Sequence, residues 1–304
     1  MKTYLASACA FVSTAICAAF SFAPSHASAA PVLVSSLASF AVLGAAGVTN
    51  VPTSTIGGNL GSSPNATVGG GYVFTSGSIQ QNTPLAQQAQ VDLDAAILAV
   101  TAGGANFTIA AGNGNLDAFQ AANGGFLVPG TYDVGAGTSN LTGNLVLNGL
   151  GDLNAVWRFR FSSTFIMSED SNVSVTGVGT GSTVGIYWFA DSAATLDGDT
   201  LVGNVFARQT ISSNGGLTLG CGRLASAEAQ VTLIMDAISL GCGVSGDIGF
   251  GSGGYDQGVS TGSGGTGGSG GEVVNGVPEP ATLFLVGMGL AGALVTRKLA
   301  STSR

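Results

Sequence analysis

The chain has 304 residues, of which 50 are glycine, 45% are hydrophobic and only 8% are charged. Between residues 30 and 276 it carries four arginines, no lysine, no histidine and fifteen carboxylates, so the net charge is four minus fifteen, or −11. Because phosphate binding requires clustered cations, this composition excludes nucleic-acid binding. The apolar content supports a buried core, and the length of this part fits one domain that turns often.

The first 29 residues have the features of a secretory signal peptide. Lys2 precedes an apolar stretch that runs from Leu5 to Phe22. The small residues Ala27-Ser28-Ala29 then form a site of the kind that signal peptidase cleaves. We therefore expect an exported chain whose folded domain spans residues 30–244.

Short runs of β type occupy the start of this domain, at residues 40–43, 54–56 and 66–68, separated by Gly, Asn and Pro. The period then changes, and Thr83 can cap a helix that opens on Pro84 and stops at Gly103-Gly104. Its predicted apolar stripe is Leu85, Ala89, Leu93, Ala96, Ile97 and Val100, with Gln87, Gln90, Asp92 and Asp94 off the stripe.

From Gly125 to about Gly243 the pattern is all β and it repeats. The segments that begin at Val184, Val202 and Cys221 echo one another, and their glycines Gly185, Gly203 and Gly222 are 18 and 19 residues apart. A period of this length with several short strands predicts stacked coils of a β-solenoid. The structural alternative is a β-sandwich with evenly spaced strands. In an earlier, looser copy at residues 155–161, we expect the aromatic residues to face the core and Arg158 and Arg160 to face outward.

The chemistry of the side chains argues against an enzyme and against a metal site. Residues 30–276 hold no lysine or histidine, which removes the usual general bases. Glu169, Asp170, Asp197 and Asp199 are interpreted as solvated turn residues, with a calcium site as the alternative, and no metal or cofactor is predicted. Cys221 and Cys242 can form a disulfide in an oxidising compartment, and two separate buried thiols are the alternative.

The C-terminal part has the order of a sorting signal. A Gly- and Ser-rich stretch at residues 245–276 predicts a flexible tether. It is followed by Val277-Pro278-Glu279-Pro280, an apolar run at residues 281–295, and the basic pair Arg297-Lys298. This segment, residues 277–304, resembles the PEP-CTERM signal of Gram-negative bacteria. The resemblance implies a membrane-held precursor that an exosortase cuts near Pro-Glu-Pro, before release to the cell surface or extracellular matrix. A plain C-terminal anchor is the alternative.

Several motifs of the body follow the order found in the DUF3494 ice-binding family, which this region resembles over about 200 residues. They include 40–44 (FAVLG), 55–61 (TIGGNLG), 86–93 (AQQAQVDL), 128–132 (VPGTY), 141–145 (LTGNL), 151–157 (GDLNAVW) and 202–207 (VGNVFA). The resemblance implies an all-β fold, a right-handed parallel β-helix of triangular section with one long α-helix packed alongside.

Members of this family adsorb to ice through a flat face of short Thr, Ser, Ala and Gly side chains. Candidates for such a face here are Thr142, Asn144, Ser171, Thr200, Thr218 and Thr232. At the coil corners only Thr200 stands where the family pattern has threonine, and several corners carry acids instead, so we expect modest rather than strong ice binding. The alternative function is a cell-surface or matrix adhesin that binds extracellular polysaccharide or cells.

Overall fold

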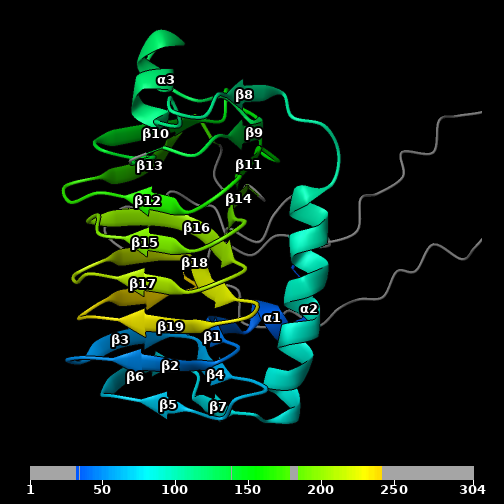
Figure 1. Ribbon diagram of the computed structural model, residues 1–304, viewed down its shortest axis with the longest axis vertical. Coiled ribbons are helices and arrows are strands. Elements are labelled where there is room, and N and C mark those ends of the chain that lie inside the picture. Colours follow the sequence, from blue (N-terminus) through cyan, green and yellow to red (C-terminus); the bar gives the residue numbers. More distant parts are fainter. Residues whose placement is uncertain (1–31, 34, 138, 179–183, 242–304) are drawn as a thin grey trace, which may run out of the picture.

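The computed structural model describes residues 32–33, 35–137, 139–178 and 184–241, which form a parallel β-helix with three faces (Figure 1). Every strand pairing among these residues is parallel, as expected for stacked coils. This confirms the predicted solenoid and excludes the sandwich. The predicted signal peptide, linker and C-terminal signal lie outside the described residues.

We name the faces A, B and C in the order in which each coil visits them. Face A contains β1 (Phe40–Gly44), β4 (Asn59–Ser62), β7 (Ile79–Gln81), β8 (Phe107–Ile109), β9 (Gly130–Val134), β11 (Val156–Phe161) and β14 (Gly185–Ala190). Face B contains β2 (Gly47–Asn50), β5 (Val68–Gly69), β12 (Phe165–Met167), β15 (Ala194–Leu196), β17 (Ile211–Ser213) and β19 (Gln230–Leu233). Face C contains β3 (Ser54–Gly57), β6 (Tyr72–Ser76), β10 (Asn144–Asn148), β13 (Asn172–Thr176) and β20 (Ala237–Ser239). Two longer strands, β16 (Thr200–Ala207) and β18 (Thr218–Ser226), run along face C, turn the corner and continue on face A.

The coils do not stack in the order of the sequence. The first coils, β1 to β7, form one end, and α2 (Pro84–Thr101) then carries the chain along the side to the other end (Figure 1). From β8 the coils return, so that β18, β19 and β20 of the last coil pair with β1, β2 and β3 of the first. The two halves of the chain therefore close on each other in the middle of the solenoid.

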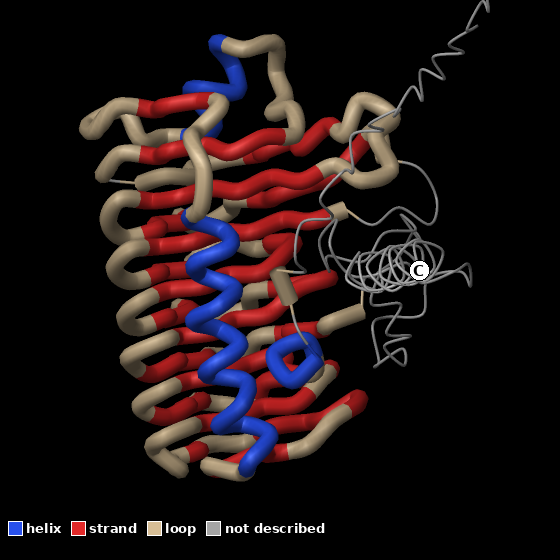
Figure 2. The backbone as a smooth tube through the Cα atoms, turned by 90° about the vertical axis from the view of Figure 1, so that its right-hand side faces the viewer, coloured by secondary structure: helices blue, strands red, loops and turns tan. Residues whose placement is uncertain are grey.

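The long helix packs on face A, as Figure 2 shows. Thr83 caps it by accepting a hydrogen bond from Ala86 N, and Pro84 occupies its first turn, as predicted. Its buried residues include most of the predicted stripe: Ala89, Leu93, Ala96, Ile97 and Val100. They cover apolar side chains that point outward from face A, such as Phe40 and Tyr187, which explains why β1 and β14 are buried on both sides.

Two residues of α2 differ from the prediction. Leu85 is 38% exposed in the first turn, whereas Asp92 is only 8% exposed. The Asp92 carboxylate accepts hydrogen bonds from Leu37 N of α1 (Ser35–Ala38) and from Gln88 Nε2. The sequence pattern predicts that Asp92 faces water, but its carboxylate instead satisfies a backbone donor at the start of the folded domain.

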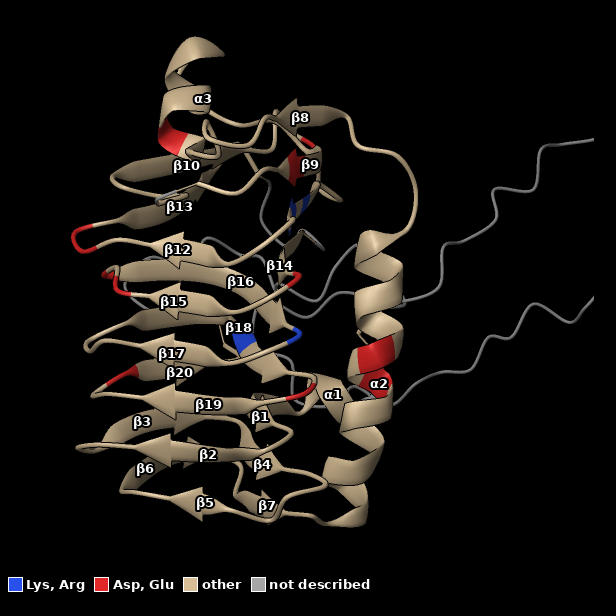
Figure 3. Cartoon of the chain, in the orientation of Figure 1, with Lys and Arg blue, Asp and Glu red and all other residues tan. Residues whose placement is uncertain are grey.

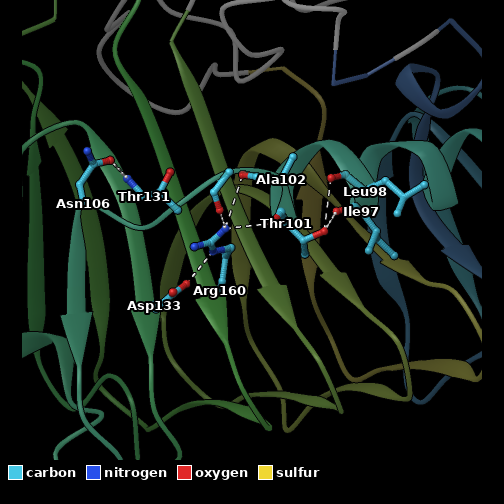
Figure 4. Close-up of polar contacts among 9 residues, drawn as sticks. Ile97, Leu98, Thr101, Ala102, Asn106, Thr131, Asp133 and Arg160 are labelled. Atoms are coloured by element: carbon cyan, nitrogen blue, oxygen red, sulfur yellow. Dashed lines mark hydrogen bonds and ion pairs between the residues drawn. The ribbon is translucent and has the colours of Figure 1, made fainter.

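Arg160 attaches the end of α2 to face A. Its Nε lies 2.6 Å from Asp133 Oδ1, and its Nη1 donates to the carbonyl oxygens of Thr101 and Gly103, both at 2.9 Å (Figure 4). A cation at a helix C-terminus is favourable because the last carbonyls lack intrahelical donors. The expected alternation of β11 is confirmed, since Trp157, Phe159 and Phe161 are buried inside the coil.

A column of aromatic rings fills the interior near α3 (Leu116–Ala122), whose Phe119 contacts Tyr132 edge to face. Phe159 lies between Tyr132 and Trp188, with ring centroids 5.1 and 4.2 Å away. Aromatic pairs of this kind contribute about 0.5–1.5 kcal/mol beyond the area they bury. The coils at this end are therefore held by ring stacking as well as by backbone hydrogen bonds.

The repeat predicted from the glycines is correct for one pair of coils and shifted by one residue for the other. Asn204 pairs with Arg223, which matches the 19-residue spacing, but Tyr187 pairs with Asn204, a spacing of 17 rather than 18. The ladder between β16 and β18 changes register between Val202 and Asn204, where β16 turns the corner. A Cβ on Gly222 would lie 1.7 Å from Gly203 O, so the backbones approach too closely there for any side chain.

Candidate functional site: two uncharged faces

Face B presents a row of short hydroxyl side chains along the solenoid axis. Its strands are three or four residues long except for the two-residue β5, and in each longer strand one half-exposed residue points outward between two buried residues that point inward. The pairings place these outward residues in one continuous row: Ile166, Thr195, Ser212, Thr232, Thr49 and Gly69. We call this set the face-B row. Four consecutive members carry a hydroxyl group.

The face-B row is regular in spacing and orientation. None of the five strand pairings that build it has a register irregularity. Neighbouring strands are about 4.8 Å apart, and Thr49 donates a hydrogen bond to Thr232, with 3.3 Å between their hydroxyl oxygens. The parallel strands therefore hold hydroxyls and methyls in a repeating, nearly planar array.

Face C presents a second row that is more varied. The pairings align Asn144, Asn172, Thr200, Thr218, Ala237, Thr55 and Val73, which we call the face-C row. This row mixes asparagine amides, threonine hydroxyls and the apolar side chains of alanine and valine. The ladders that include β16 with β18 and β3 with β6 each contain a register shift. Face C is consequently less uniform than face B.

The strands of faces B and C contain no charged residue, and the charges flank them (Figure 3). Along the corner between B and C, the acids Glu169, Asp170, Asp197 and Asp199 line a shallow concavity of about 300 Å³. Among the described residues, no group of three or more His, Cys, Asp and Glu is arranged to hold a metal ion. On the corner between A and B, Arg208 lies 2.6 Å from Asp191.

Four of the six residues proposed from the sequence lie on these two faces. Asn144, Thr200 and Thr218 are members of the face-C row, and Thr232 belongs to the face-B row. Ser171 is corrected by the structure, because it is fully buried and donates its hydroxyl to Leu141 O. Thr142 is exposed but belongs to neither row, and its hydroxyl donates to Asp117 Oδ2 and accepts from Asn115 Nδ2 at the start of α3.

Sequence reasoning missed Thr49, Thr195 and Ser212 of the face-B row. Their signal was present: each stands between two inward residues in a short triplet, at 48–50 (VTN), 194–196 (ATL) and 211–213 (ISS). Such triplets recur at 17- and 20-residue intervals through Thr232. The family pattern places threonine at the coil corners, which lie at the edge of face B and not within it.

A buried carboxylate fixes the corner between B and C from inside. Asp236 accepts hydrogen bonds from Leu217 N, Ile234 N and the Ser213 hydroxyl, and its own amide donates to the Ser54 hydroxyl. Burial raises the pKa of Asp236, although these donors oppose the shift. This cluster joins the last coil to the first and keeps the edge of face B in position.

Among the residues that the structure describes, no helix is long and apolar enough to cross a membrane. Cys221 forms a disulfide. Its predicted partner Cys242 lies outside the described residues, as do Val277-Pro278-Glu279-Pro280, Arg297 and Lys298.

Comparison with known proteins finds matches to the folded domain and to the C-terminal sorting signal. A sequence model of the PEP-CTERM protein-sorting motif matches residues 276–298. This motif implies export and sorting at a membrane. A protein of Nostoc sp. strain HG1 named ice-binding protein is 31% identical over 228 residues, covering 74% of this chain and 80% of that relative.

Solved structures share the fold. An ice-binding protein from an Antarctic biological consortium is 27% identical with a TM-score of 0.57, covering 69% of this chain and 90% of that one. The ice-binding protein of the ascomycete Antarctomyces psychrotrophicus gives the same identity and TM-score over 67% and 95%. The DUF3494 domain of Shewanella frigidimarina ice-binding protein 1, at 22% identity, has a TM-score of 0.55 over 69% and 97% and shows the fold alone. Because the model of the ice-binding-like family matches residues 42–239, the chain belongs to that family.

Proposed function

We propose that this protein is exported and adsorbs to ice through face B. The observation that carries the proposal is the face-B row, in which Thr195, Ser212, Thr232 and Thr49 repeat in unbroken register across four neighbouring strands. Membership of the ice-binding-like family supports ice as the ligand.

The physical basis is an array of ordered water. Each hydroxyl holds a water molecule by a hydrogen bond, and the intervening methyls exclude water that would compete for other orientations. Because the strands repeat at about 4.8 Å, the held waters form a regular layer that can join the lattice. Each contact is weak, but all must break together for the protein to leave.

Charge placement is the second argument for face B. A carboxylate orients water around itself and disturbs such a layer, and the strands of face B carry no charge. Asp197 and Asp199 stand at its edge, which limits the usable width of the face. We therefore expect modest rather than strong inhibition of ice growth.

The location follows from the sequence signals. We propose that signal peptidase removes residues 1–29, that residues 30–244 form the folded domain on a linker at 245–276, and that exosortase processes residues 277–304. The protein then resides at the cell surface or in the extracellular matrix of a Gram-negative bacterium. The motif match at residues 276–298 supports this route.

Two assays test the proposal. The purified protein should partition into slowly grown ice and inhibit recrystallisation. Thr232→Tyr on face B should lose this activity, whereas Thr218→Tyr on face C should keep it. The two variants are matched because both side chains are half-buried and point outward. If the unmodified protein is excluded from ice but binds extracellular polysaccharide, the adhesin alternative replaces the ice proposal.

A further inference from the structure

The two ends of the solenoid differ in how they are covered. At the end near β8, the helix α3 lies over the coils, with Leu116 fully buried and Phe119 in edge contact with Tyr132 (Figure 1). At the other end the outermost strands are β5, β6 and β7. Each of them pairs with a single described strand, β2, β3 and β4 respectively. Their other edges are therefore free of any described strand.

The free end exposes part of the interior. The inward residues of its coil are Val68, Tyr72, Phe74 and Ile79, which pair with buried residues of the next coil. The first three are only partly buried, and Ile79 is 44% exposed. Repeat proteins ordinarily end in a capping unit with a polar outer surface. Among the described residues this end has no such unit, so its apolar layer is available to a partner.

Strand β6 has the longest free edge at this end, with five residues. Ser54 N donates to Gly71 O at 3.3 Å, so the backbone groups of Gly71 and Val73 point toward β3. Because these groups alternate along a strand, the N–H and C=O of Tyr72 and Phe74 point toward the free edge. The register shift of this ladder falls after Phe74, and the strand (YVFTS) contains neither a charge nor a proline, which are usual protections of an edge. Residues 72–74 therefore form a regular edge that can accept another strand.

The charge distribution indicates which partner fits this edge. Residues 32–91, which include every strand of the free end, carry no charged side chain, and the first charge is Asp92 within α2. Over residues 30–276 the net charge is four minus fifteen, or −11, so two copies repel each other in most orientations. Contact through the free ends keeps the charged parts of both copies apart. This uncharged end therefore fits a second copy of the chain better than it fits a charged ligand.

We propose that two copies of this chain associate end to end through antiparallel pairing of their β6 strands. A two-fold axis at Val73 places Val73 opposite Val73 of the partner subunit. Tyr72 then lies opposite Phe74 of the partner subunit, and each such pair exchanges two backbone hydrogen bonds. The inward residues of the two end coils cover each other, and the outward Val73 side chains meet on face C. Face B of each copy stays exposed, and the inference does not depend on the proposed function.

Sedimentation of the purified protein over a range of concentrations tests the pairing, and we expect a reversible dimer. Val73→Glu places two carboxylates directly opposite each other, so it should raise the dimer dissociation constant by about tenfold or more. Thr55→Glu is the matched control. Thr55 pairs with Val73 one strand further from the end and is also exposed, so this variant adds the same charge away from the edge and should leave the constant unchanged.

A cross-link tests the geometry even where Val73→Glu alters the fold. In a non-hydrogen-bonded antiparallel pair the Cα atoms are about 4.5 Å apart, which is within the range of a disulfide. Val73→Cys should therefore form a disulfide-linked dimer under mild oxidation, whereas Thr55→Cys should not. An unmodified protein that is monomeric at every concentration overturns the inference. Equal weakening by the two glutamate variants, or equal cross-linking of the two cysteine variants, overturns it as well.

Discussion

Arg223 provides a direct test of how the two halves of the solenoid are joined. Its guanidinium, 5% exposed, donates to Asn204 Oδ1 at 2.6 Å, to Phe40 O at 3.2 Å and to Ala38 O at 3.3 Å. These acceptors belong to the start of the domain and to the neighbouring coil. Burial lowers the pKa of Arg223 to about 10, so the side chain remains charged at neutral pH.

The variant Arg223→Ala should lower the free energy of unfolding by about 3–5 kcal/mol. Hydrogen bonds from a charged donor contribute about 1.5–3 kcal/mol each, and three acceptors lose this donor. The variant also removes the desolvation cost of the buried guanidinium, which offsets part of that sum. The remaining loss is similar to that of breaking a buried ion pair. In a domain of this size the melting temperature should fall by about 6–20 °C.

Denaturant unfolding followed by circular dichroism measures the difference, with Arg208→Ala as the matched control. Arg208 forms an exposed ion pair with Asp191, so its removal should change stability by less than about 1 kcal/mol. If Arg223→Ala is as stable as Arg208→Ala, the proposed junction between the first and last coils does not depend on this residue.

Three further predictions concern stability. Reduction of the Cys221 disulfide should lower the free energy of unfolding by about 3 kcal/mol, and an unchanged denaturation midpoint would argue against a closed loop. Phe159→Ala should cost about 3–5 kcal/mol by opening the aromatic column, whereas a loss below about 1 kcal/mol would show that the column adds little. For Asp236, the folded pKa is raised above the unfolded one, so the folded state binds its proton more tightly. The stability of the unmodified protein relative to Asp236→Asn should therefore rise as the pH falls from 7 toward about 4, and a fall would contradict the assignment.

Much of the fold could be predicted because the coils repeat and each strand alternates between inward and outward residues. The helix from Pro84 was also predictable, since its cap and stripe are local signals. The role of Asp92 was not, because its partner Leu37 N is 55 residues away. The pairing of β1 with β18 was equally hidden, since nothing in the local sequence indicates that the last coil stacks on the first.

The candidate face was harder to predict than the fold. Alternation shows that Thr200 and Thr232 both point outward, but not that they lie on different faces. That assignment depends on where each strand turns a corner, and β16 and β18 continue through one without a break. The burial of Ser171 was unpredictable for the same reason, because a residue at a corner can point inward or outward.

The most direct test of the account is to place Thr195→Tyr and Thr200→Tyr, fluorescently labelled, on single ice crystals. The two threonines are five residues apart in one coil, both are half-buried, and they belong to the face-B and face-C rows respectively. We predict that Thr195→Tyr loses at least about tenfold of the fluorescence that the unmodified protein leaves on ice, a difference of about 1.4 kcal/mol or more, while Thr200→Tyr retains it. Retention by Thr195→Tyr with loss by Thr200→Tyr would contradict the assignment of face B.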